Sequence, residues 1–324
     1  MGLMRMKFFA VFVLCLLLVP TISLKASTSA QLRYLRDGHC KISGALDPAL
    51  LLNVKKSCDR FMNGGEGQLR AFRQKVAVTK EVRGVDLLDE QSAFCREFDT
   101  VKKCKAVLGD IPFLQYFNVW REDEVVRSLS TSPELAELAS SLMRVRRVRL
   151  YQDSLFLKRV GDGCTNYHSD LRMAPFDTND FVTFWIPLVD IPKHGSALVF
   201  VSGSHNDIAL NFWRSRKQVA NMDLSKRYKN AEAHHMPLSV GDITAHSGWV
   251  LHSADGNVGP SDRLALAVSY VSADAVIRKG WDEFEAGHEE DFASYGSWVK
   301  DVKVGKRIKD SHPSVPVISF PRKE

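Results

Sequence analysis

The hydrophobic residues follow one period before Arg147 and another after it. Upstream, in STSPELAELASSLMRV, Ser132 is a candidate N-cap, Pro133 takes the first helical position and Glu134 lies in the first turn. Leucines then recur three and four residues apart, which predicts a helix with one buried face. We therefore expect a helical scaffold over about residues 46–146. The residues expected on the buried face of this helix are Leu135, Leu138 and Leu142.

Beyond Arg147 the chain consists of short runs rich in β-branched and aromatic residues, separated by Gly, Pro, Asn and Asp. Examples are DFVTFWIPL, ALVFV and RLALAVSYVSA. No helical segments alternate with these runs, so the pattern favours an antiparallel barrel or jelly roll over a doubly wound parallel sheet. We expect a mainly β protein with flanking helices: a single domain over residues 27–324, with its core at about 147–275 and a tail at 276–324.

The composition is that of an ordinary globular protein, with 45% hydrophobic and 25% charged residues in a chain of 324. No internal repeat or low-complexity tract indicates a solenoid or a disordered chain. The net charge of +6 arises from 44 basic and 38 acidic residues. This balance is too mixed to indicate nucleic-acid binding, and we expect no nucleic-acid partner.

The first residues have the layout of a secretory signal peptide. Arg5 and Lys7 precede an apolar run at 8–19, which is short for a transmembrane helix, although a signal anchor is an alternative. The next stretch has Ser, Thr and basic residues but no acid before Asp37, as transit peptides do. We expect residues 1–26 to be a targeting peptide, leading to the ER and secretion or, as a bipartite signal, to a plastid. No stable membrane span is expected after cleavage.

The cysteines allow two interpretations. In the secretory route an even set predicts two disulfides, whereas the alternative is that they are small buried hydrophobic residues. The set consists of Cys40, Cys58, Cys95 and Cys104.

The stretch NYHSD contains a candidate pair of metal ligands. Residues two apart in a strand point to the same face, so His168 and Asp170 can aim an imidazole and a carboxylate at one point. The alternative is an ordinary polar turn. A second histidine would complete the two-histidine, one-carboxylate site of non-haem iron oxygenases. In GDITAHSGWVLHSADGN both His246 and His252 are candidates, and chemistry alone does not separate them.

Arg263 follows His252 by eleven residues and opens the strand RLALAVSYV. It shares a strand face with Ala265, Ala267 and Ser269. A guanidinium beside small side chains suits a cavity that accepts a carboxylate.

Taken together, these motifs resemble the phytanoyl-CoA dioxygenase family of Fe(II)/2-oxoglutarate oxygenases. The resemblance implies a double-stranded β-helix (jelly roll, cupin-like), with His168, Asp170 and His252 on iron and Arg263 holding the distal carboxylate of 2-oxoglutarate. It covers most of the chain after about residue 148. The matching stretches are LYQDSLFLK, H-x-D, FWIPLVDIP, GSALVFVSGSH, GDITAHSGWVLH, the spacing of Asn257 and Arg263, and the tail EEDFASYGSWVKDVKVG.

One position departs from the family pattern. Many relatives carry Ser two residues after the distal histidine, where this chain has Ala254. Ser253 or Ser269 is a candidate to replace it beside the cosubstrate carboxylate. Trp185 is a candidate pocket wall or a core residue. The intact Asp170 favours oxygenation over halogenation, because halogenating relatives replace this carboxylate with a small residue.

The resemblance implies a dioxygenase that uses Fe(II), 2-oxoglutarate and O2 to oxidise an unactivated C–H bond of a small metabolite, releasing succinate and CO2. Hydroxylation, desaturation and oxidative ring closure are the candidate outcomes, and a role in secondary metabolism is expected. Two other hypotheses stay open: a non-catalytic jelly-roll binding protein, and a cupin-like metalloenzyme that does not use 2-oxoglutarate.

An insertion between Asn206 and Met236 interrupts the strand pattern. It is either a solvated helix and loop or a basic lid that attracts a carboxylated or anionic small-molecule substrate. Its basic residues are Arg214, Arg216, Lys217, Lys226, Arg227 and Lys229.

Overall fold

Two antiparallel sheets build the protein. The structure, a computed structural model, describes residues 26–83, 113–193, 195–207, 227–228, 230–279, 295–296, 298–299 and 301–320. The main sheet has seven strands in the order β1-β9-β6-β11-β3-β13, with β2 also paired to β3. Its strands are β1 (His39–Ile42), β2 (Leu114–Phe117), β3 (Val148–Lys158), β6 (Phe181–Pro187), β9 (Ile243–Ser247), β11 (Arg263–Ser272) and β13 (Val317–Ile318).

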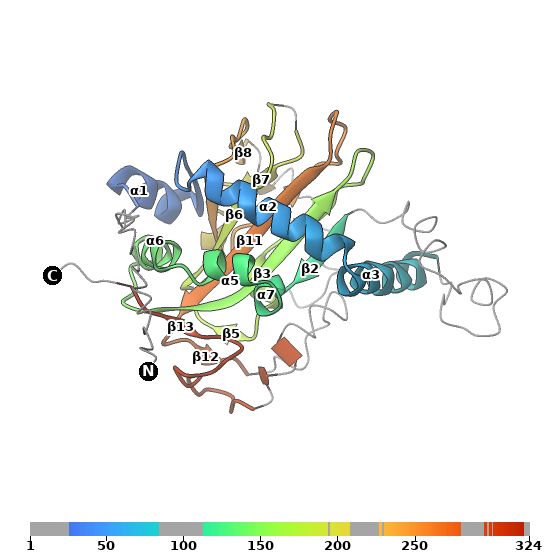
Figure 1. The fold of residues 1–324 in the computed structure, drawn as a ribbon. Helices are drawn as coiled ribbons and strands as arrows, with labels where there is room; N and C mark the ends of the chain where they lie inside the picture. Colours follow the sequence, from blue (N-terminus) through green and yellow to red (C-terminus); the bar gives the residue numbers. More distant parts are fainter. Residues whose placement is uncertain are drawn as a thin grey trace, which may run out of the picture.

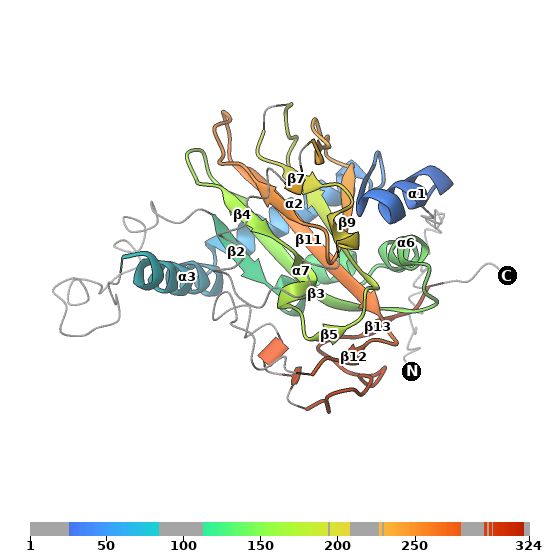
Figure 2. The same ribbon diagram turned by 180° about the vertical axis from the view of Figure 1, so that it is seen from behind.

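The second sheet has four strands in the order β4-β10-β7-β8. These strands are β4 (Thr165–His168), β7 (Leu198–Val201), β8 (Glu232–His234) and β10 (His252–Ala254). A small pair, β5 (Phe176–Asp177) with β12 (Val276–Ile277), completes the strands. The second sheet lies behind the main one in Figure 1 and in front of it in Figure 2, and all pairings between these strands are antiparallel. This confirms the expected jelly roll.

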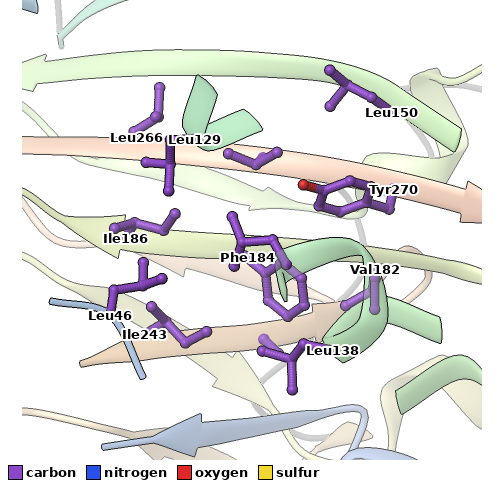
Figure 3. Close-up of a cluster of buried hydrophobic side chains, with 14 of the residues drawn as sticks. Leu46, Leu129, Leu138, Leu150, Val182, Phe184, Ile186, Ile243, Leu266 and Tyr270 are labelled. Carbon is purple, nitrogen blue, oxygen red and sulfur yellow. The ribbon is translucent and has the colours of Figure 1, made fainter. Parts of the chain in front are cut away.

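Helices cover the other face of the main sheet (Figure 1). Strand residues that alternate toward them, among them Leu150, Phe184, Leu266 and Tyr270, form a buried core with helical leucines (Figure 3). The helices are α1 (Thr28–Asp37), α2 (Pro48–Asn63), α3 (Gly65–Arg83), α5 (Glu124–Ser130) and α6 (Pro133–Met143), with a short 3-10 turn at Val119–Arg121.

Helix α6 forms as the sequence predicts. The Ser132 hydroxyl accepts a hydrogen bond from the amide of Leu135, and Pro133 is the first helical residue. Leu135, Leu138 and Leu142 are fully buried. An N-cap of this kind satisfies one of the free amides at a helix start.

The division into scaffold, core and tail is less clean than expected. Strand β2 lies inside the stretch expected to be helical, β1 precedes that stretch, and β13 belongs to the tail. All three pair with core strands, β1 with β9 and the other two with β3. Because these strands have four residues or fewer, they carry too little periodicity to be recognised in the sequence.

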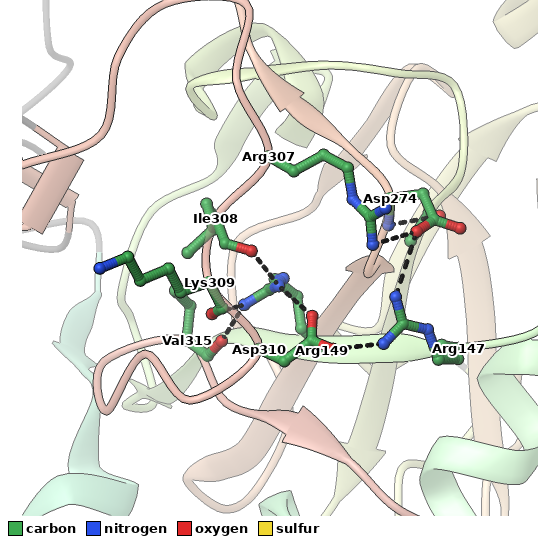
Figure 4. Close-up of polar contacts among 9 residues, drawn as sticks. Arg147, Arg149, Asp274, Arg307, Ile308, Lys309, Asp310 and Val315 are labelled. Carbon is green, nitrogen blue, oxygen red and sulfur yellow. Dashed lines mark hydrogen bonds and ion pairs between the residues drawn. The ribbon is translucent and has the colours of Figure 1, made fainter.

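The tail is held to the main sheet by Arg149 of β3. Its buried guanidinium donates hydrogen bonds to the backbone carbonyls of Ile308, Lys309 and Val315 (Figure 4). Its neighbour Arg147 lies nearer the surface and pairs with Asp274 and Asp310 (Figure 4).

Cys40 and Cys58 are buried and unpaired, as in the second interpretation of the cysteines, and burial raises the pKa of the Cys40 thiol to about 12. Cys95 and Cys104 lie outside the described residues, as do the expected targeting residues 1–25. Within the described ranges, no helix is long and apolar enough to cross a membrane.

Candidate metal centre and cosubstrate pocket

His168 and His252 face each other across two paired strands. His168 ends β4, His252 begins β10, and the two are partners in the ladder. Asp170 does not continue β4 but begins the short helix α7 (Asp170–Met173). Because Ser169 between them is extended, at φ −130° and ψ 133°, His168 and Asp170 still point to one side. The two side chains thus lie on the same side, as predicted, although the chain passes from a strand into a helix between them.

The three side chains form a compact set of candidate ligands. Asp170 Oδ1 lies 3.8 Å from Nε2 of His168 and 3.5 Å from Nε2 of His252. The ligand atoms all lie within 4.8 Å of one another, and no other such group of three occurs among the residues the structure describes. These atoms therefore converge on one point.

Both histidines are oriented by their other ring nitrogen. Nδ1 of His168 lies 2.9 Å from the carbonyl oxygen of Asn166, and Nδ1 of His252 lies 3.1 Å from that of Val250. A carbonyl only accepts, so each Nδ1 carries the proton and each Nε2 presents a lone pair. This is the arrangement in which histidines bind metals in proteins.

The second carboxylate oxygen of Asp170 points away from this set. Oδ2 accepts a hydrogen bond of 2.7 Å from the Thr183 hydroxyl and lies 3.1 Å from Nε2 of His246. His246, the rival candidate in the sequence, therefore lies on the far side of the carboxylate. The structure groups His168, Asp170 and His252 as the set that could hold a metal ion.

The electrostatics of the site favour an ionised Asp170 and a neutral His252. Burial by itself would raise the pKa of Asp170, but His252, His246 and His168 outweigh it and hold that pKa well below its usual range. Burial and the neighbouring His168 lower the pKa of His252, against the opposing effect of Asp170. A cation at this point would therefore meet one negative charge and two free nitrogen lone pairs.

Among the described residues, Arg263 is a buried cation with no carboxylate partner. It is 6% exposed, and its Nε atom has no hydrogen-bond partner. No ion pair joins it to a carboxylate of the described residues. Burial lowers its pKa to about 10, which leaves it charged at neutral pH. Because a buried guanidinium is costly unless it is paired, the site calls for an anionic ligand.

The other predicted residues differ in how they lie relative to Arg263 and Asp170. Trp185 lies beside Arg263, with the guanidinium carbon 5.4 Å from the ring centre. Ser269 lies on the same face of β11 as Arg263, but its hydroxyl is 3.0 Å from that of Thr183, toward Asp170. Ser253 alternates with His252 on β10, so its side chain points to the opposite face of that sheet. Ser253 is thus poorly placed to replace the missing serine at Ala254.

The sequence interpretation missed the roles of Thr183 and His246. Both are polar residues at buried strand positions, which was the available signal. Thr183 is the single polar residue of β6, whereas His246 shares β9 with Thr244 and Ser247. Lys158 lies opposite Arg263 on β3, and its ammonium donates to the carbonyl of Asp255 at 2.8 Å. Burial and then Arg263 lower the pKa of Lys158 to about 8.

Two imidazoles and one carboxylate on a jelly roll define the site of a non-haem iron oxygenase, and the unpaired Arg263 suits the carboxylate of a cosubstrate. The model of the phytanoyl-CoA dioxygenase (PhyH) family matches residues 34–265. The chain therefore belongs to the phytanoyl-CoA dioxygenase family.

Solved structures share the fold at low identity. The 2-oxoglutarate-dependent carbocyclase SnoK from nogalamycin biosynthesis has a TM-score of 0.62 at 19% identity, covering 93% of this chain and 99% of that one. The epimerase SnoN of the same biosynthesis has a TM-score of 0.60 at 20% identity, covering 90% of this chain and 98% of that one. EctD from S. alaskensis has a TM-score of 0.55 at 16% identity, covering 79% of this chain and 80% of that one. SnoN has been solved with Fe3+ and alpha ketoglutarate, and EctD with iron.

Two curated proteins match part of the chain. A probable alpha-ketoglutarate-dependent hypophosphite dioxygenase of Stutzerimonas stutzeri is 21% identical over 176 residues, 53% of this chain. Lipoteichoic acid synthase 1 of Bacillus subtilis is 22% identical over 165 residues, 47% of this chain. The chain spans 59% of the length of the first and 25% of the second.

Proposed function

We propose that this protein oxidises a C–H bond of a small, carboxylated or anionic metabolite, with release of succinate and CO2 from 2-oxoglutarate. The observation that carries the proposal is the combination of two features on the inner face of the main sheet. One is the set of convergent ligand atoms of His168, Asp170 and His252, and the other is the buried Arg263, which has no ion-pair partner among the described residues. A binding protein without catalysis has no need of both.

Each residue has a defined part in this proposal. The Nε2 atoms of His168 and His252 and one carboxylate oxygen of Asp170 would hold Fe(II). Arg263 neutralises the distal carboxylate of 2-oxoglutarate, and the small Ala265 and Ala267 on its strand face leave space for the chain of that molecule. When bound, iron with 2-oxoglutarate and O2 supplies the oxidising chemistry.

The substrate class rests on weaker support. The solved neighbours include a carbocyclase and an epimerase, and EctD has been solved with 5-hydroxyectoine, so one fold serves several outcomes on small molecules. We propose hydroxylation, desaturation or oxidative ring closure in secondary metabolism. Of the basic residues of the insertion, Arg227 pairs with Asp207 at 2.6 and 2.7 Å, and the other five lie outside the described ranges.

Binding of Fe(II) and 2-oxoglutarate under anaerobic conditions tests the proposal directly. We expect a visible absorption band when both are added to the apoprotein, and succinate formation after admission of O2. His168→Ala and Asp170→Ala should abolish both. A variant of either residue that keeps full turnover would contradict the ligand assignment.

The same measurements separate the alternatives. A non-catalytic binding protein would show no succinate at all, and a cupin-like metalloenzyme would turn over without 2-oxoglutarate. To find the substrate, the iron-loaded protein is screened against a metabolite extract for 2-oxoglutarate-dependent mass changes. Gain of one oxygen indicates hydroxylation, and loss of two hydrogens indicates desaturation or ring closure.

We also propose that residues 1–26 direct the chain into the secretory pathway or, through a bipartite signal, to a plastid. The support is the basic start and the apolar run at 8–19. A fluorescent fusion with and without residues 1–26 tests this, since only the full chain should leave the cytosol.

A further inference from the structure

A row of polar side chains crosses the inner face of the main sheet beside Asp170. A buried sheet face is usually apolar, so polar residues at neighbouring positions of five strands call for an explanation. Strand pairing places them side by side, each the ladder partner of the next. In sheet order they are His39 of β1, His246 of β9, Thr183 of β6, Ser269 of β11 and Gln152 of β3.

Two members of this row donate to the same atom, Asp170 Oδ2. The Thr183 hydroxyl has one proton and uses it on this oxygen at 2.7 Å. The 3.0 Å contact between Thr183 and Ser269 must then be donated by Ser269. Ser269 thereby fixes the direction of the Thr183 hydroxyl, and the order of donation is Ser269 to Thr183 to Asp170.

His246 supplies the second donor. Its Nε2 lies 3.1 Å from Asp170 Oδ2, and its Nδ1 is buried without a hydrogen-bond partner among the described residues. A proton on Nδ1 would bury an N–H group unsatisfied and turn a lone pair toward the carboxylate. The proton therefore belongs on Nε2, where it bonds Asp170.

We propose that Thr183 and His246 are positioning residues that hold Asp170 in one-oxygen coordination of the metal. With both donors on Oδ2, only Oδ1 faces His168 and His252. A carboxylate without such donors can turn and bind a metal through both oxygens. The second oxygen would then occupy a position that the cosubstrate or O2 needs. This inference rests on the proposed iron site and concerns how the chain builds it.

Matched substitutions separate the donor role from packing. Thr183→Val keeps the shape and removes the hydroxyl, whereas Thr183→Ser keeps the hydroxyl. His246→Leu removes the donor, whereas His246→Gln can place an amide N–H near the position of Nε2. The control is Thr244→Val: Thr244 is buried on the same face of β9, and its hydroxyl has no hydrogen-bond partner among the described residues.

The probe is Co(II) alone, titrated into the apoprotein and followed by calorimetry and by its visible spectrum. Removing a group that orients a metal ligand typically weakens metal binding 10- to 100-fold. We expect losses of about this size and an altered Co(II) spectrum for Thr183→Val and His246→Leu. The Co(II) affinities of Thr183→Ser, His246→Gln and Thr244→Val should stay within about 3-fold of that of the natural protein.

The outcomes are distinguishable. Unchanged Co(II) affinity and spectrum in folded Thr183→Val and His246→Leu would overturn the inference while leaving the iron site intact. Loss of binding in His246→Gln equal to that in His246→Leu would also overturn it, because His246 would then act otherwise than as a donor. Failure of the natural protein to bind Co(II) would overturn the proposed iron site and this inference with it. If the stronger variants do not fold, Ser269→Ala provides the test, with a smaller loss expected and no change contradicting the inference.

Discussion

Arg263 stands over the ring of Trp185, with the guanidinium carbon 5.4 Å from the ring centre. The two residues come from neighbouring strands, β11 and β6, and both are buried. An aromatic face attracts a cation but does not neutralise it, so the charge of Arg263 stays available to an anion. The indole thereby also keeps the guanidinium in place before the cosubstrate arrives.

Removing the charge of Arg263 should impair 2-oxoglutarate binding selectively. Loss of one partner of a buried charge pair costs about 2–5 kcal/mol, so we expect Arg263→Gln to raise the KM for 2-oxoglutarate about 30-fold or more. Metal affinity measured without 2-oxoglutarate should change little. The KM of Arg263→Lys should lie between those of the natural protein and Arg263→Gln, because an ammonium keeps the charge but lacks the planar fork of the guanidinium. Equal KM values for the natural protein and Arg263→Gln would contradict the assigned role.

Trp185 should contribute through its ring. A cation–π contact is worth about 0.5–2 kcal/mol, so we expect Trp185→Leu to weaken 2-oxoglutarate binding about 2- to 30-fold. Trp185→Phe retains an aromatic face and should lose less. Calorimetric titration of the metal-loaded protein with 2-oxoglutarate measures both. If Trp185→Leu lowers Tm but leaves this affinity unchanged, the residue serves packing alone.

Asp153 should make the unfolding free energy depend on pH. Burial raises its pKa from 3.8 to about 7, although Ser130 and the amide of Trp120 donate to it. In the unfolded chain the carboxyl ionises near pH 4. Between pH 4 and pH 7 the folded state therefore keeps a proton that the unfolded state releases, and stability falls as the pH rises.

Asp153→Asn removes this dependence. The unfolding free energy of the variant minus that of the natural protein should therefore rise by at least about 1 kcal/mol from pH 5 to pH 7.5. Urea unfolding at the two pH values provides the measurement. A difference between the two proteins that is the same at both pH values would contradict the raised pKa.

Arg149 should hold the C-terminal segment to β3. Three carbonyl oxygens lose their donor in Arg149→Met, and a buried group left unsatisfied costs about 1–3 kcal/mol. We expect a loss of about 3 kcal/mol in unfolding free energy and faster proteolysis within residues 301–320. Arg147→Met is the matched control, because its partly exposed ion pairs should contribute less than about 1 kcal/mol. Similar losses in both variants would contradict a specific role for Arg149.

Much of the fold was predictable because it depends on local pattern. The cap at Ser132, the leucine face of α6 and the long strands β3, β6 and β11 follow from residue type and spacing. Strands β1, β2 and β13 were not predictable. Each is stabilised by the neighbouring strand rather than by its own sequence, and so carries no sufficient local signal.

For the site, the sequence by itself determined the available chemistry: an imidazole and a carboxylate two residues apart, two later histidines, and an arginine on a small-residue strand face. Only the tertiary structure decided which histidine joins the ligand set and which bonds the carboxylate. That choice depends on the pairing of β10 with β4 and of β9 with β6, between segments far apart in the chain. A shift of one residue in the register of either ladder would reverse which side chains face inward. No local pattern in the sequence specifies this register.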